Sequence, residues 1–157
     1  MARDIRGFTV FELMVSSIII VFIFTATITT YIMLDKIWQE DLVLTDLMRS
    51  TNIALEQIIR GVRGNEGLEA AKAVTAPLEG LSSNIVQYTD YNNTSRSFYY
   101  SNNSIYASGG KVILSNVVSA AFYNIDNIIL QIDLVTHRYV VNKEIRYHLQ
   151  TRVKRRN

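Results

Sequence analysis

The chain has 157 residues, enough for one ordinary domain and an additional segment. Lysine and arginine together number 16 and aspartate and glutamate 14, so the formal net charge of +2 indicates no nucleic-acid or other polyanionic partner. Cysteine is absent, which excludes disulfides, thiolate metal sites and cysteine nucleophiles. Aliphatic residues gather before residue 35, and tyrosines and asparagines after residue 80. This asymmetry suggests two parts that contact different solvents.

An apolar run extends from Leu13 to Leu34 without a charge, a glycine or a proline. Its 22 residues match the roughly 20 that a helix needs to cross the hydrocarbon core of a bilayer. Arg3 and Arg6 precede the run, whereas three acidic residues and a single lysine occupy the seven positions after it. The excess of positive charge on the N-terminal side places the N-terminus in the cytoplasm and the rest of the chain outside.

Glu12 lies at the start of this run, where a charge is costly: roughly 2.5–3.5 kcal/mol at the centre of a membrane helix. A plain single-span anchor explains the length and flanks of the run but not Glu12. A second interpretation is that the carboxylate reaches back to the lipid head groups, because it lies about one turn from the start of the run. A cleaved secretory signal fits poorly, since its apolar core is shorter and ends in a small-residue cleavage site.

The stretch "RGFTVFELMV", residues 6–15, resembles the class III signal of type IV pilins and of the pseudopilins of type II secretion. Its features are a short basic leader that ends in glycine, then an aromatic residue, and a glutamate at the fifth position of the mature chain. The resemblance implies that a prepilin peptidase removes residues 1–7 by cutting between Gly7 and Phe8, and then methylates the new amino group of Phe8. It also implies subunit assembly through Glu12 and Phe8, because the carboxylate can pair with the Phe8 amine of a neighbouring subunit.

Apolar residues recur at steps of three and four beyond the membrane run, which predicts that the helix continues. They form one face: Leu44, Leu47, Thr51, Ala54, Leu55, Ile58 and Val62. The expected helix runs from about Phe8 to Val62, roughly 80 Å at 1.5 Å per residue, and ends at glycines that begin with Gly61. Its hydrophobic membrane and assembly part covers residues 8–34, and its amphipathic part residues 35–63.

Residues 64–80 are predicted to be a linker with a short helix, and residues 81–157 an antiparallel β-sheet head. Two short strands are expected on either side of a turn at residues 102–103, and a strand or short turn at 111–114. Strands near 117–123 and 128–134 are expected to flank a turn at 126–127, and residues 142–154 close the chain with alternating apolar residues. The amphipathic helix face can cover one side of such a sheet, so the fold class is α+β, with a long N-terminal helix packed on the head.

The segment from Val112 to Asn157 resembles the J-type minor pseudopilins and their minor pilin counterparts, in "LSNVVSAAFY" and in the ending "QTRVKRRN". This resemblance favours a minor subunit over a major one. The lack of a cysteine pair also departs from the disulfide-closed C-terminal loop of many major pilins.

No catalytic, metal-binding or cofactor-binding pattern is recognisable, so the chain is not expected to be an enzyme or to need a cofactor. His137 and His148 are the two histidines, and their spacing is not that of a metal site. A cluster of positive charge closes the chain: Arg152, Lys154, Arg155 and Arg156. This basic patch could bind DNA or an acidic partner, or it could be a solvated terminus, which we favour.

We therefore expect a minor pilin or pseudopilin, a structural subunit of a type II secretion pseudopilus or a type IV pilus, that primes assembly or lies at the tip. Its expected partners are other such subunits, the prepilin peptidase, the inner-membrane assembly platform and membrane lipid. Its expected location is the cytoplasmic membrane as a single-pass protein with the head outside, then a periplasmic or cell-surface filament. The alternatives are a DNA-binding or adhesive minor pilin and an unrelated single-span membrane protein.

Overall fold

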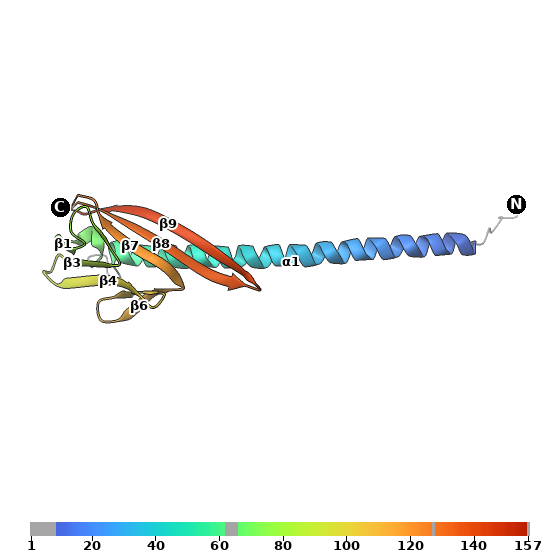
Figure 1. The fold of residues 1–157 in the computed structure, drawn as a ribbon, viewed down its shortest axis with the longest axis horizontal. Coiled ribbons are helices and arrows are strands. Elements are labelled where there is room, and N and C mark those ends of the chain that lie inside the picture. Colours follow the sequence, from blue (N-terminus) through green and yellow to red (C-terminus); the bar gives the residue numbers. More distant parts are fainter. Residues whose placement is uncertain (1–8, 62–65, 127, 157) are drawn as a thin grey trace, which may run out of the picture. The chain divides into compact units, whose positions relative to one another are not determined.

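The computed structural model describes residues 9–61, 66–126 and 128–156. Contacts divide the chain into two compact units, Met1–Glu40 and Asp41–Asn157. The helix α1, Val10–Arg60, begins in the first unit and ends in the second (Figure 1). The second unit, Asp41–Asn157, is the head.

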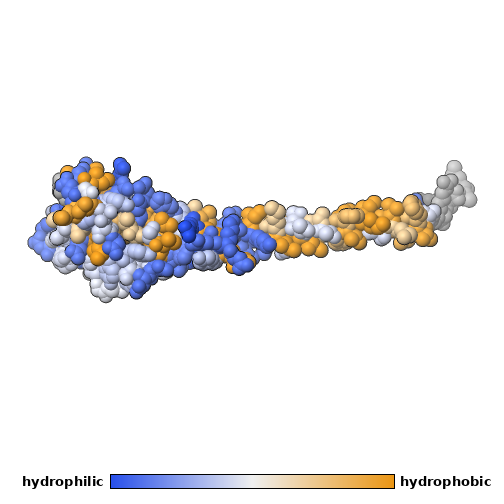
Figure 2. All heavy atoms as spheres, viewed as in Figure 1, coloured by the Kyte–Doolittle hydropathy of each residue, from blue (hydrophilic) through white to orange (hydrophobic). Residues whose placement is uncertain are grey.

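The described part of the first unit is helical and almost entirely exposed, and it includes the apolar run. In Figure 2 these residues are mostly coloured as hydrophobic. The hydroxyls of Thr25, Thr27, Thr29 and Thr30 each donate to the carbonyl four residues earlier, at 2.8–2.9 Å. These bonds satisfy the threonine hydroxyls within the helix itself, which would allow the helix to lie in lipid. Among the described residues, α1 is the one helix long and apolar enough to cross a bilayer.

In the head, α1 buries the face that its sequence predicts. Leu47, Thr51, Ala54 and Ile58 are buried, and Leu44 and Leu55 are partly buried. The next position on this face, residue 62, lies outside the described residues. The helix ends where Gly61 adopts φ +75° and donates to the carbonyl of Gln57 at 2.9 Å. This left-handed conformation is the usual end of a helix and favours glycine.

Two antiparallel sheets form the rest of the head. One has the order β1-β3-β4-β5-β6 and the other β2-β7-β8-β9. A short 3₁₀ helix, η1, spans Leu68–Ala70. The strands are β1 (Ala73–Ala76), β2 (Ser82–Ser83), β3 (Ile85–Thr89), β4 (Ser95–Ser101), β5 (Ser104–Ala107), β6 (Lys111–Ser115), β7 (Val117–Asn124), β8 (Ile129–Val140) and β9 (Lys143–Lys154). The α+β class with an antiparallel head is therefore confirmed.

Two of the turns between these strands lie where the sequence predicts them. Asn102 and Asn103, both with positive φ, join β4 to β5. Asp126 accepts hydrogen bonds from the backbone N–H groups of Ile128 and Ile129, at 3.1 and 2.7 Å, before β8 begins. Asparagine and aspartate suit such positions because their short side chains tolerate positive φ and cap turns.

One core joins the helix to both sheets. Ala54 and Ile58 of α1 belong to the same buried cluster as Phe98 of the first sheet and Phe122 and Ile132 of the second. A buried hydrogen bond of 3.1 Å also joins the hydroxyls of Thr51 on α1 and Thr136 on β8. The helix face thus supplies the cover that the sheet needs.

The segment predicted as a linker with a short helix differs in detail. Its helix is the single 3₁₀ turn η1, and residues 73–76 form β1 instead, which pairs with β3. Alanine favours helices only weakly, by tenths of a kcal/mol per residue, so a partner strand decides the conformation of so short a segment.

Candidate functional site

The start of α1 is a reciprocal hydrogen-bonded cap. The backbone N–H and the hydroxyl of Thr9 both donate to Oε2 of Glu12, each at 3.0 Å. In return, the backbone N–H of Glu12 donates to the Thr9 hydroxyl at 3.3 Å. This is a capping box, in which residue T of a T-x-x-E sequence precedes the helix and the glutamate is its third residue.

The capping box gives Glu12 a role within its own chain that the sequence analysis did not consider. A carboxylate at a helix N-terminus satisfies otherwise unpaired N–H groups and interacts favourably with the helix dipole. Both hydrogen bonds from Thr9 go to Oε2 of Glu12. A carboxylate can accept about four hydrogen bonds, so Glu12 can still accept bonds from an external amine. Thr9 is the site residue that the sequence analysis missed, although the T-x-x-E spacing was there to read.

The predicted cleavage and methylation positions, Gly7 and Phe8, lie outside the described residues. In the sequence, only Phe8 separates the peptide bond that would be cut from Thr9, the first residue of the capping box.

The surface that follows Glu12 is apolar on all sides. Its large side chains include Phe11, Leu13, Met14, Ile18 and Phe22, all exposed. A helix that is hydrophobic all round needs an apolar environment, such as lipid or a hydrophobic protein surface. Glu12 is thus a carboxylate at the edge of a surface suited to burial.

The basic end predicted as a patch is partly used inside the head. Arg156 pairs with Glu69 of η1 at 2.7 Å, and Arg155 donates to the backbone carbonyl of Lys72 at 3.0 Å. Arg152 donates to Gln131 at 3.2 Å. These contacts join β9 and the residues after it to η1, to Lys72 and to β8, whereas Arg152, Lys154 and Arg156 remain exposed.

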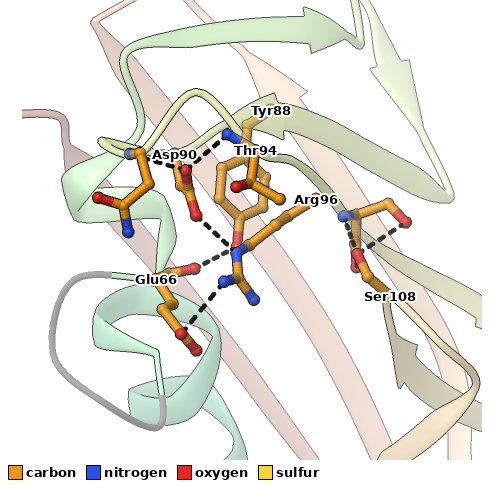
Figure 3. A network of polar contacts seen from close by, with 8 residues as sticks. Glu66, Tyr88, Asp90, Thr94, Arg96 and Ser108 are labelled. Carbon is orange, nitrogen blue, oxygen red and sulfur yellow. Dashed lines mark hydrogen bonds and ion pairs between the residues drawn. The ribbon is translucent and has the colours of Figure 1, made fainter.

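A second polar cluster lies where the β3–β4 hairpin meets the segment after α1 (Figure 3). Asp90 is fully buried, and its Oδ1 accepts from the N–H groups of Asn92 and Thr94, both at 2.9 Å. Its Oδ2 accepts from Nε of Arg96 at 2.8 Å, and the same guanidinium pairs with Glu66 at 3.1 Å.

This cluster holds the hairpin against the chain that leaves the helix. The Arg96 hydrogen bond, followed by the backbone bond from Thr94, holds the pKa of Asp90 below its ordinary value. Burial raises the pKa of Tyr88, whose hydroxyl donates to the Glu66 carbonyl at 2.5 Å, so it stays protonated. Each charge here has a partner within the cluster, which is the pattern of a structural network rather than of a reactive site.

A pocket of about 390 Å³ opens beside this cluster, lined among others by Gln57, Tyr88, Arg96, Ser108 and Lys111. No histidine is among the described residues that line it, and the hydroxyls of Ser97 and Ser108 lie 3.4 Å apart. No group of three or more metal-binding side chains occurs within the described part of the chain.

Each of the two histidines contacts a carboxylate. His137 contacts Glu144 at 2.8 Å and lies edge-on to the ring of Tyr139, with centroids 5.6 Å apart. His148 contacts Asp133 at 3.0 Å. Both pairs lie between neighbouring strands of the β8–β9 hairpin, where cross-strand side-chain contacts support strand pairing.

Comparison of the chain with family models, curated proteins and solved structures gives no match.

Proposed function

We propose that this chain is a minor subunit of a pilin-like filament, either a type II secretion pseudopilus or a type IV pilus. In this proposal a prepilin peptidase cuts between Gly7 and Phe8 and methylates Phe8. The mature chain waits in the cytoplasmic membrane with its head outside. It then enters the filament by its N-terminal helix, at or near the tip.

The observation that carries the proposal is the placement of Glu12. It is a carboxylate at the very start of an exposed, uncharged apolar helix, five positions after the glycine of a basic leader. A helix made only to anchor a protein would gain a cap from this residue, but glutamine could supply that cap without placing a charge beside lipid. A helix that must stop at one axial step against its neighbour gains a reference point, because only one step pairs Glu12 with the Phe8 amine of the next subunit.

The capping box refines this proposal. By bonding to Thr9, the carboxylate is held at the helix end in a single orientation before any neighbour arrives. Preorganisation of this kind lowers the entropy lost on docking. The same residue therefore serves the helix of its own subunit and the docking of the next.

Because Glu12 has two roles, the experiment must separate charge from capping. Glu12→Gln keeps the capping box, which accepts glutamine, but removes the charge. Thr9→Ala removes the capping hydroxyl but keeps the charge, and Glu12→Ala removes both. Each variant is produced in cells with an active pilus or secretion machine. Intact mass reports processing, and the amount in sheared filaments relative to the membrane pool reports assembly.

We expect Glu12→Gln and Glu12→Ala to be processed normally and to enter filaments at least tenfold less than the unmodified chain. Thr9→Ala should assemble within about twofold of it. If Glu12→Gln assembles normally while Thr9→Ala fails, Glu12 acts through capping, and its role in docking is refuted. If the unmodified chain never enters a filament in any such host, the proposed function itself is wrong.

A further inference from the structure

The tip of the β8–β9 hairpin exposes two large side chains, Tyr139 and Val141. Val140 pairs with Lys143, so Val141 and Asn142 form the turn. Tyr139 is 66% exposed and Val141 is 78% exposed. In Figure 1 this hairpin extends past the ends of the other strands of the head. An aromatic and an aliphatic side chain are thus presented together at a protruding point.

The backbone of the turn makes this exposure notable. Val141 has φ +55°, a left-handed conformation that a β-branched side chain adopts at a cost. Asparagine or glycine would adopt this conformation more easily and would expose less apolar surface to water. The chain therefore carries a valine where both the local conformation and solvation disfavour it, which is expected where a side chain serves an interaction.

Contacts within the head show where the tip points. Thr136 of β8 contacts Thr51 of α1, and two residues further along β8, Arg138 pairs with Asp46, five residues earlier on α1. Strand and helix therefore run in opposite directions. From Arg138 to Val141 is about 10 Å at ~3.3 Å per residue, and from Asp46 to Asp41 about 7.5 Å at 1.5 Å per residue. The tip thus lies level with the first residue of the head.

The chain leaves the head at this same end, toward the membrane run. Only residues 35–40 separate Asp41 from Leu34, the last residue of the apolar run. The end of the head that carries Tyr139 and Val141 is therefore the end tethered to the bilayer. Tethering gives even a weak surface contact a high effective concentration.

We propose that the β8–β9 tip is a lipid contact, in which Tyr139 and Val141 enter the head-group layer of the membrane that anchors the chain. Tyrosine is enriched in this layer because its ring is apolar and its hydroxyl is polar. Two side chains are far too small for a stable protein interface, which buries about 800 Å² on each partner. A tethered lipid contact needs no such area.

Charge contributes less than these two side chains. Arg138, Lys143 and Arg146 lie near the tip, but Arg138 pairs with Asp46 and Arg146 with Glu144. The contact is therefore expected to be insensitive to salt, unlike a purely electrostatic attraction to anionic lipid. It orients the head of a waiting subunit, and it depends on the membrane helix but not on filament assembly.

The test uses the full chain in vesicles of phosphatidylcholine with a minor share of phosphatidylglycerol. Because the chain has no cysteine, Asn142→Cys provides a single site for a fluorescent label at the tip. Asn92→Cys provides a matched control in the turn between β3 and β4. The next residue, Asn93, bonds to Lys72, which contacts Arg155 near the start of β8, so this turn lies at the opposite end of β8 from the tip. Lipids that carry a quencher just below the head groups report the depth of each label.

We expect quenching at position 142 to exceed that at position 92 at least twofold, and to persist in 0.5 M salt. Adding Tyr139→Ser and Val141→Asn to the tip variant should reduce quenching to the level at position 92. Asparagine tolerates positive φ, so this double variant should keep the turn, and each single variant should show an intermediate effect. Equal quenching at both positions would overturn the proposal. Quenching at position 142 that survives the double variant would also overturn it, because the dye and not the two side chains would then enter the lipid.

Discussion

Replacing Ile58 by alanine tests how α1 holds the head together. The side chain is fully buried between the helix and both sheets. The substitution removes three carbon groups, a loss of about 2.4 kcal/mol at ~0.8 kcal/mol each. The cavity left behind adds to this, within the 2–5 kcal/mol typical of buried isoleucine-to-alanine changes. We expect the free energy of unfolding to fall by about 3–4 kcal/mol.

Ile53 provides a matched control on the same helix. It is the same residue type, five positions earlier, and its side chain is 48% exposed. Ile53→Ala should change the free energy of unfolding by no more than about 0.5 kcal/mol, because alanine also favours the helix. Urea unfolding of the full chain in detergent micelles, followed by circular dichroism, measures both. A similar loss in the two variants, or a loss below about 1 kcal/mol for Ile58→Ala, would refute the buried helix face.

Three further predictions concern the head. Because contacts in the fold lower the pKa of Asp90, its charge stabilises the fold above its ordinary pKa, and this stabilisation is lost as the pH falls through the lowered value. Asp90→Asn should therefore be less stable at neutral pH, and its free energy of unfolding should fall less than that of the unmodified chain between about pH 6 and pH 3. Urea titration at each pH measures this, and parallel curves of unfolding free energy against pH would contradict it. Arg155→Ala should lower the free energy of unfolding by about 1 kcal/mol through its lost hydrogen bond, whereas Lys154→Ala, on an exposed side chain, should leave it unchanged. Val141→Asn should raise the melting temperature by relieving the positive φ of a β-branched residue, and a lower melting temperature would show that the valine is not strained.

Periodicity predicts the long helix and its buried face from sequence because both depend on spacing along a single element. The apolar run marks the part of the helix that does not pack on the head. The part that does pack on the head is marked by the stripe that includes Leu47, Thr51, Ala54 and Ile58. The strands from β4 to β9 are likewise recognisable from alternation and turn residues. Alternation does not reveal how strands divide between two sheets, because that division depends on contacts between distant residues.

The structure departs from the sequence prediction where a distant partner decides. Residues 73–76 are alanine-rich and weakly helical by propensity, but pairing with β3 makes them a strand. The cluster of Glu66, Asp90 and Arg96 joins residues up to 30 positions apart, and no local pattern announces it. The basic end similarly reads as a patch in sequence because Glu69, the partner of Arg156, lies 87 positions away.

The capping box was within reach of the sequence, since T-x-x-E is a local signature. The described geometry shows that a single carboxylate can be satisfied locally and still retain acceptors for a neighbour. Variants at Glu12 must therefore be interpreted together with variants at Thr9.

The central claim is that the chain is processed and retained as a prepilin-like subunit, and the intact mass of the membrane-bound protein tests it most directly. In cells with an active prepilin peptidase, we predict the loss of residues 1–7 and the addition of one methyl group at the new N-terminus. Cells that lack the peptidase should yield the full-length, unmethylated chain. An uncleaved N-terminus in the presence of the peptidase, or cleavage after the apolar run, would contradict the account.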